Sequence, residues 1–213
     1  MFKILNRLVK LIASIIIFSI IIGLIVSVFY PIGYINIINK YSKEYKVDPY
    51  LVVSMINVES KYNKDAISNK DARGLMQIGP QTGQWASEVL KIDNYNESQL
   101  FNPEINIKIG TWYIDQLKKE FGDNMNLVLA AYNAGSGNVN KWLLDEKHSK
   151  DGRLINIPFS ETDDYLNRVK KNYRIYKLIY KPYMEKPDTI YSIYIDAIIN
   201  IRSILIKTLK SLR

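Results

Sequence analysis

A glutamate at position 59 lies where the helical pattern of the sequence calls for an apolar side chain. Asp48-Pro49 is a typical helix start, and Val52, Met55 and Ile56 follow at the spacing of one helical face. Glu59 is the next position on that face, so we expect its carboxyl group to point inward. Burial disfavours the charged carboxylate, which should raise the pKa and allow proton donation near neutral pH. A general acid needs these properties, although an inward Glu more often pairs with an Arg or caps a neighbouring helix.

The composition leaves carboxylates as the main acid and base groups of the chain. Its 213 residues include no Cys and a single His, His148, which lies in a polar run and is expected in an exposed loop. Thiol nucleophiles, disulfides and Cys/His zinc sites are therefore excluded. The formal charge of +8 is spread without a dense basic patch, which argues against nucleic-acid binding.

The N-terminal segment has the pattern of a membrane anchor. No charged residue occurs between Lys10 and Lys40, and residues 11–30 are almost wholly apolar. About 20 such residues span a bilayer as a helix, and the basic residues before them favour an N-terminus inside the cell. A cleaved signal peptide is the alternative. We expect an uncleaved anchor, because the stretch is long for a signal sequence and no A-x-A site follows it.

The rest of the chain reads as successive helices, with Pro at first-turn positions and Gly at helix ends. No alternating strand is visible, so the predicted class is all-α. Residues 160–163 resemble a capping box that opens a long helix, which should run toward Tyr180 and stop before Pro182. Core packing is expected for at least two of the three tryptophans, Trp85, Trp112 and Trp142.

Residues 190–212 form a strongly amphipathic pattern at the C-terminal end. Arg202, Lys207, Lys210 and Arg213 give its last part a charge of +4 without acidic residues. A basic amphipathic helix of this kind could lie on an anionic membrane surface, or it could pack against the domain or a partner helix. The sequence leaves both possibilities open.

Several short segments together resemble the SLT-domain lytic transglycosylases, which are relatives of goose-type lysozyme. They are Glu59-Ser60, Ser68, ARGLMQI at residues 72–78, AYNAG at residues 131–135, and Glu161-Thr162 with Tyr165 and Val169. The resemblance covers residues 38 to 181. It implies a lysozyme-like helical domain at residues 38–182, between an anchor and connector at residues 1–37 and the amphipathic helix at residues 183–213.

The resemblance also implies a reaction: cleavage of the β-1,4 bond between N-acetylmuramic acid and N-acetylglucosamine in peptidoglycan, without a metal or organic cofactor. Glu59 would protonate the glycosidic oxygen and then act as base on the C6 hydroxyl of the muramic acid, which leaves a 1,6-anhydro end. Most glycosidases use two carboxylates. The other candidates, Asp65, Asp71 and Glu88, belong to no motif, which fits a substrate that supplies its own nucleophile.

The substrate-binding residues implied by the resemblance are Ser68, Met76, Gln77, Tyr132, Asn133, Glu161 and Tyr165. Ser68 and Gln77 offer hydrogen bonds suited to sugar amides, Tyr132 would reach Glu59, and Tyr165 would present a flat face to a pyranose. Glu161 is the rival for general acid. We assign it instead to the groove wall, because the dipole of a helix N-terminus stabilises a charged carboxylate there.

The implied protein is a single-pass bacterial membrane protein whose catalytic domain faces the cell wall, with peptidoglycan strands and the membrane as partners; protein partners are not indicated. A hydrolytic muramidase using the same Glu59 is the nearest alternative. A glycan-binding scaffold of a wall-spanning machine is a second, and a helical membrane adaptor is a third, although an adaptor would not require polar residues at inward positions.

Overall fold

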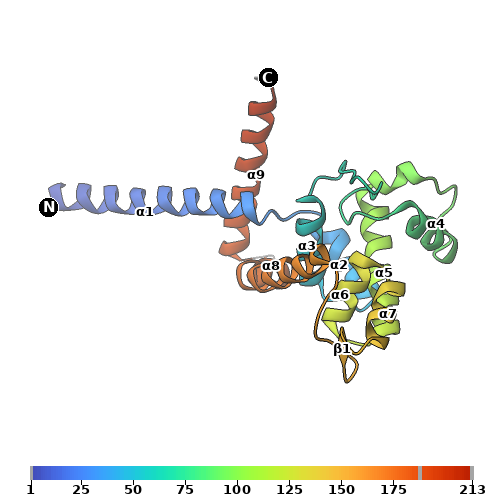
Figure 1. Cartoon of the computed structure of the whole chain (residues 1–213). Helices are drawn as coiled ribbons and strands as arrows, with labels where there is room; N and C mark the ends of the chain where they lie inside the picture. Colours follow the sequence, from blue (N-terminus) through green and yellow to red (C-terminus); the bar gives the residue numbers. More distant parts are fainter. Residues whose placement is uncertain (1, 187–188, 212–213) are drawn as a thin grey trace. The chain divides into compact units, whose positions relative to one another are not determined.

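The structure, a computed structural model, describes residues 2–186 and 189–211, except for the side chain of Lys210. It confirms the all-α class and adds one short hairpin (Figure 1). The helices are α1 (Phe2–Phe29), α2 (Ile35–Glu44), α3 (Pro49–Ser60), α4 (Pro80–Val89), the 3₁₀ helix η1 (Glu97–Phe101), α5 (Pro103–Phe121), α6 (Met125–Ala134), α7 (Ser136–Leu144), α8 (Ser160–Glu185) and α9 (Ile190–Ser211). Strands β1 (Ser149–Lys150) and β2 (Arg153–Leu154) pair antiparallel.

The chain divides into two compact units. One is Gly33–Leu178, which contains α2 to α7, the hairpin and most of α8. The other combines Met1–Ile32 with Ile179–Arg213 and therefore joins α1, the end of α8 and α9.

Helix α3 forms the centre of the larger unit. It begins as predicted, with Pro49 in its first turn and the Asp48 carboxylate accepting a 2.8 Å hydrogen bond from the Tyr50 amide. The residues from Tyr50 to Asn57 are buried on every side of the helix. The local sequence therefore marks α3 as a core helix. The direction in which Glu59 points depends on what packs around its last turn.

Helix α8 differs from its prediction at both ends. The Phe159 carbonyl accepts the first backbone hydrogen bonds, from Thr162 and Asp163, so the helix begins at Ser160 and Phe159 takes the cap position expected for Ser160. At the other end, α8 continues through Pro182 to Glu185. Proline disturbs the helical hydrogen bonds of the preceding turn. The Tyr191 hydroxyl donates a 2.6 Å hydrogen bond to the Ile179 carbonyl in that turn, which supports the helix there.

In the smaller unit, α1 is long and apolar enough to cross a membrane by length and composition. Most of its residues are exposed. Helix α9 packs against α1, and the Tyr180 hydroxyl at the end of α8 donates a 2.7 Å hydrogen bond to the Tyr30 carbonyl just after α1. The structure therefore shows α9 packed against another helix of the same chain.

Candidate active site

A polar groove of about 420 Å³ collects most of the predicted site residues of the larger unit. It is lined by Glu59, Ser68, Asn69, Lys70, Ala72, Gln77, Tyr132, Asn133 and Glu161. These come from the end of α3, the loop that follows it, the end of α6 and the start of α8. Segments separated by about a hundred residues in the chain therefore meet around one carboxyl group.

Glu59 is the most strongly perturbed acid of this groove. Burial raises the pKa of its carboxyl group to about 7, and the nearby Glu161 acts in the same direction. Tyr165 and the Arg168 guanidinium lower the pKa of Glu59, but burial prevails. A group with this pKa is present in both protonation states near neutral pH, so it can donate a proton and later accept one.

The loop between α3 and α4 is held in shape by its own polar groups. The Ser68 hydroxyl oxygen accepts hydrogen bonds from the amides of Lys70 (3.2 Å) and Ala72 (3.0 Å). The Gln77 side-chain nitrogen donates to the carbonyls of Ala66 (3.2 Å) and Gly74 (2.9 Å). Both of these partners are acceptors, so they fix the position of the Gln77 amide nitrogen. Among the residues that the structure describes, neither the Gln77 side-chain oxygen nor the Ser68 O–H has another hydrogen-bond partner, and both residues line the groove.

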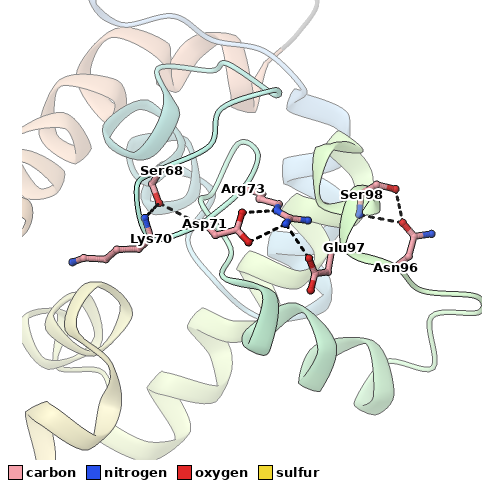
Figure 2. A network of polar contacts seen from close by, with 8 residues as sticks. Ser68, Lys70, Asp71, Arg73, Asn96, Glu97 and Ser98 are labelled. Atoms are coloured by element: carbon pink, nitrogen blue, oxygen red, sulfur yellow. Dashed lines mark hydrogen bonds and ion pairs between the residues drawn. The ribbon is translucent and has the colours of Figure 1, made fainter.

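Arg73 fastens the outer side of this loop, as Figure 2 shows. Its guanidinium makes two hydrogen bonds of 2.9 Å to the Asp71 carboxylate and a 2.9 Å ion pair with Glu97 of η1. A bidentate Arg–carboxylate pair fixes geometry as well as charge. The predicted motif ARGLMQI therefore contains a residue that braces the loop and does not line the groove.

Asn106 of α5 is a positioning residue that the sequence analysis missed. It is fully buried, and its side-chain oxygen accepts a 2.7 Å hydrogen bond from the Met76 amide. Its side-chain nitrogen donates to the carbonyls of Arg73 (2.9 Å) and Leu100 (2.8 Å). Asn106 shares a helical face with Gly110 and Ile114. A polar residue on an apolar stripe, the signal that marked Glu59, could have identified it.

Tyr132 and Asn133 connect α6 to the other groove walls. The Tyr132 hydroxyl donates a 2.8 Å hydrogen bond to the Met76 carbonyl, and burial together with the Glu59 charge raises the pKa of Tyr132. The Asn133 side-chain oxygen accepts a 2.8 Å hydrogen bond from the Thr162 hydroxyl in the first turn of α8. Both residues line the groove while they hold its walls together.

Met76 and Tyr165 lie elsewhere than predicted. The Met76 side chain is fully buried, so only its backbone takes part in the groove wall. The Tyr165 ring is 1% exposed and cannot offer a flat face to a sugar. Its hydroxyl lies close enough to Glu59 to lower the pKa of that group, although no regular hydrogen bond joins them. The Met76 side chain lies against Gly110 of α5, and Tyr165 lies near Glu59 of α3 and Tyr132 of α6.

Glu161 forms part of the groove wall at the start of α8, where it pairs with Lys70 at 3.4 Å. Asp65, Asp71 and Glu88 lie outside the groove lining, where they pair with Lys64, Arg73 and Gln84 respectively. Glu161 is thus the second carboxylate of the groove. Within residues 2–186 and 189–211, no group of three or more His, Asp or Glu side chains is placed to hold a metal ion.

Two of the tryptophans, Trp112 and Trp142, are buried, as predicted. Trp85 is 46% exposed and packs edge-on against Trp112, with a ring-centre distance of 4.7 Å. Trp85 does not line the groove around Glu59.

A mostly helical domain with one protonatable carboxyl group in an open polar groove is the arrangement of a lysozyme-like domain. The family described as "Transglycosylase SLT domain" matches residues 36–155, more than half of the chain. The chain therefore belongs to the SLT transglycosylase family.

Known proteins agree with this assignment. The soluble lytic murein transglycosylase of Escherichia coli K12 is 33% identical over 166 residues, which cover 76% of this chain and 25% of that protein. The membrane-bound lytic murein transglycosylase C of Pectobacterium atrosepticum is 29% identical and covers 66% of this chain and 46% of that protein. Among solved structures, an inactive Glu-to-Gln variant of the lytic transglycosylase Slt from Pseudomonas aeruginosa matches with a TM-score of 0.65 and 31% identity, over 72% of this chain and 25% of that one. This chain thus spans about a quarter of the length of the soluble relatives.

Proposed function

We propose that this chain is a membrane-anchored lytic transglycosylase that cleaves the β-1,4 bond between N-acetylmuramic acid and N-acetylglucosamine in peptidoglycan. The observation that carries the proposal is the carboxyl group of Glu59, which has a pKa of about 7 and lies in a polar groove of about 420 Å³. Membership of the SLT family supports it, and so do relatives whose names describe lytic murein transglycosylases.

Glu59 acts twice in the proposed reaction. Its protonated form donates a proton to the glycosidic oxygen as the bond from that oxygen to the anomeric carbon breaks. The resulting carboxylate then accepts the proton of the C6 hydroxyl while O6 of the same muramic acid attacks the anomeric carbon. The product carries a 1,6-anhydro end, no water is consumed, and Glu59 regains its proton.

The groove residues assist by binding and by electrostatics. The Ser68 hydroxyl, the Gln77 carbonyl and the Asn133 amide lie where they can hydrogen-bond the acetamido groups of the glycan. Burial raises the pKa of both Tyr132 and Tyr165, so both hydroxyls stay protonated. Tyr165 can therefore donate to Glu59 when that group becomes a carboxylate.

Helix α1 serves as an uncleaved anchor in this proposal, with the N-terminus inside the cell and the catalytic unit on the wall side of the membrane. Its length and apolar composition suit a single span. The basic residues Lys3, Arg7 and Lys10 precede the apolar stretch, as expected for the cytoplasmic end of a span.

A hydrolytic muramidase is the second candidate, and Glu161 is the observation that favours it. This exposed carboxylate lines the same groove as Glu59 and could activate a water molecule. Its ion pair with Lys70 and its place in the first turn of α8 fit a groove-wall role better.

Mass spectrometry of the muropeptides released from purified peptidoglycan separates these functions. The full chain in detergent should release products that end in 1,6-anhydro-muramic acid, one water (about 18 Da) lighter than hydrolysed ends. Glu59→Gln should remove this release, while Glu161→Gln, the matched control on the opposite wall, should retain it.

Reducing ends that disappear with Glu161→Gln would establish the muramidase instead. Absence of release by a folded wild-type protein that still sediments with peptidoglycan would favour the glycan-binding scaffold.

A further inference from the structure

We propose that α9 is a second membrane element, which docks on α1 at Gly23 and lies in the outer surface of the bilayer with an apolar strip among the lipids. This inference rests on the membrane-anchor part of the proposed function. It concerns only the smaller unit, in which both helices lie. In this arrangement the exposed apolar face of α9 contacts the lipids of an anionic membrane surface.

The docking contact is specific. The Tyr194 hydroxyl of α9 donates a 2.6 Å hydrogen bond to the Ser19 carbonyl of α1. The Ser19 hydroxyl donates a 3.3 Å hydrogen bond to the Tyr194 hydroxyl oxygen. At Gly23, one turn further along α1, an added Cβ atom would lie 2.4 Å from the Tyr194 hydroxyl and 2.9 Å from the Ile198 side chain. Small residues on a membrane helix allow this close approach, and a polar group at that depth needs a partner.

The depth of the contact fits a helix at the membrane surface. Gly23 precedes Tyr30, the end of the apolar stretch, by seven residues, which is about 10 Å of helix at 1.5 Å per residue. Amphipathic helices that lie in the interface bury their apolar face by about 5–10 Å. A helix attached to α1 at Gly23 is therefore held at the depth that such helices occupy.

Helix α9 carries more apolar surface than α1 covers. The side facing the other helices of this unit includes the buried residues Ile195 and Ile198. Other apolar residues, on this side of the helix or next to it, remain exposed; they are here called the outer strip. The outer strip consists of Ile190, Ile193, Ile204 and Leu205, which are 89%, 68%, 63% and 49% exposed. Several large apolar side chains that stay exposed on one helix indicate a surface that is covered in the working protein.

Charge and helix direction favour lipid as the cover. Lys207 is exposed on the last part of α9, and no acidic residue follows Asp196 in the sequence. A basic segment beside an apolar strip suits anionic headgroups. Figure 1 shows α9 crossing α1, in agreement with contacts at Ser19 and Gly23. If α1 spans the membrane, a helix whose axis lies across α1 has its axis nearer to the membrane plane than to the membrane normal.

A second transmembrane span is the main competing arrangement. With 22 residues, α9 is about 33 Å long and could reach across a bilayer. Asp196, Arg202 and Lys207 would then lie within the span, and charged side chains there are costly. Asp196 already accepts a 2.8 Å hydrogen bond from the Tyr183 hydroxyl at the end of α8.

Single-cysteine labelling tests the lipid contact directly, because the natural chain has no Cys. Leu205→Cys and Ser203→Cys lie on opposite sides of α9, since two residues turn a helix by about 200°. Each full-length variant would be labelled with an environment-sensitive fluorophore and reconstituted in phosphatidylcholine vesicles with and without phosphatidylglycerol. The label at position 205 should be quenched by a lipid-borne nitroxide and protected several-fold from aqueous iodide. The label at position 203 should show the reverse.

Equal exposure of both labels to iodide would overturn the proposal. Ser211→Cys tests on which side of the membrane the end of α9 lies. In sealed vesicles it should react with a membrane-impermeant maleimide added on the side of the catalytic unit. Reaction only after permeabilisation would identify a second span and overturn the in-plane arrangement.

Gly23→Leu tests the docking contact, with Ala13→Leu as the control that adds similar bulk at an exposed position of α1. Lipid-borne quenching at position 205 should fall several-fold with Gly23→Leu and stay unchanged with Ala13→Leu. An unchanged signal in both variants would refute docking at Gly23. Muropeptide release by the same preparations is measured separately, so a failure of the proposed activity cannot be mistaken for a failure of this inference.

Discussion

The hydroxyl of Tyr132 donates a 2.8 Å hydrogen bond to the carbonyl oxygen of Met76 and so joins two walls of the groove. Tyr132 belongs to α6, whereas Met76 belongs to the loop that also carries Gln77. The Met76 amide donates in turn to the Asn106 side chain. Both backbone polar groups of Met76, its amide and its carbonyl, are therefore hydrogen-bonded by side chains from helices α5 and α6. The position of Gln77 beside Glu59 therefore depends on contacts far away in the sequence.

Tyr132→Phe should weaken both the fold and the activity. The change leaves the Met76 carbonyl without its donor, which should cost about 1–2 kcal/mol in the free energy of unfolding. Urea unfolding of the full chain in detergent measures this loss, and muropeptide release measures the activity. Tyr113→Phe, which alters the ring packed against Tyr132 without touching Met76, is the control and should leave release nearly unchanged. Equal loss in both variants would show that the hydrogen bond is not the cause.

Glu59→Gln should make the protein more stable above neutral pH. Burial raises the pKa of Glu59 from its ordinary value of 4.5 to about 7. Between these pH values the folded protein retains a proton that the unfolded chain has released, so the free energy of unfolding falls as the pH rises. Gln does not titrate. The variant should therefore gain up to about 3 kcal/mol relative to wild type above pH 7, at about 1.4 kcal/mol per pKa unit.

Unfolding by urea at acidic and alkaline pH measures this difference. The gain should disappear below pH 4.5, where Glu59 is protonated in both states. A difference that does not vary with pH would contradict a raised pKa.

Glu161→Gln and Arg168→Gln should shift the alkaline limb of the activity profile in opposite directions. Cleavage requires protonated Glu59, so kcat/KM should decline above a pH of about 7. Glu161 raises the pKa of Glu59, so Glu161→Gln should move the alkaline limb to lower pH. Arg168 lowers the pKa of Glu59, so Arg168→Gln should move the limb to higher pH. Lys141→Gln, on α7, removes a charge outside the groove and should leave the limb in place. Shifts in the same direction for Glu161→Gln and Arg168→Gln would refute this account.

Gly74→Ala should disrupt the loop that carries Gln77. Gly74 has a φ of +77°, and an added Cβ atom would lie 2.1 Å from the Leu100 carbonyl oxygen, a backbone atom that cannot easily move. We expect a loss of at least about 2 kcal/mol in stability together with a large loss of activity. Gly152 is a matched control, because its φ is +70° but no atom lies within 4 Å of the added Cβ. Gly152→Ala should cost about 1 kcal/mol from backbone strain alone and leave cleavage intact.

The sequence by itself determined the helical class, the apolar N-terminal segment and the residue types of the groove. These features are local: Asp48-Pro49 starts a helix by capping, and the apolar stretch at residues 11–30 suits a span through its composition. Helical periodicity also predicted an inward direction for Glu59, which continues the face of Val52, Met55 and Ile56. Because α3 is buried on every side up to Asn57, the packing around its last turn decides that direction.

Only the tertiary structure decided which groove residues reach the substrate side. Met76 and Tyr165 belong to the predicted motifs, yet both side chains are buried, Met76 against Gly110 of α5 and Tyr165 near Glu59 and Tyr132. Asn106 positions the loop through hydrogen bonds to residues at 73, 76 and 100, and no local pattern specifies those partners. The pKa of Glu59 likewise arises from desolvation by several elements at once, and α9 finds its contact at Gly23 only when both ends of the chain meet. Packing and desolvation depend on all the residues that surround a side chain in the folded protein, and the sequence alone does not show which residues those are.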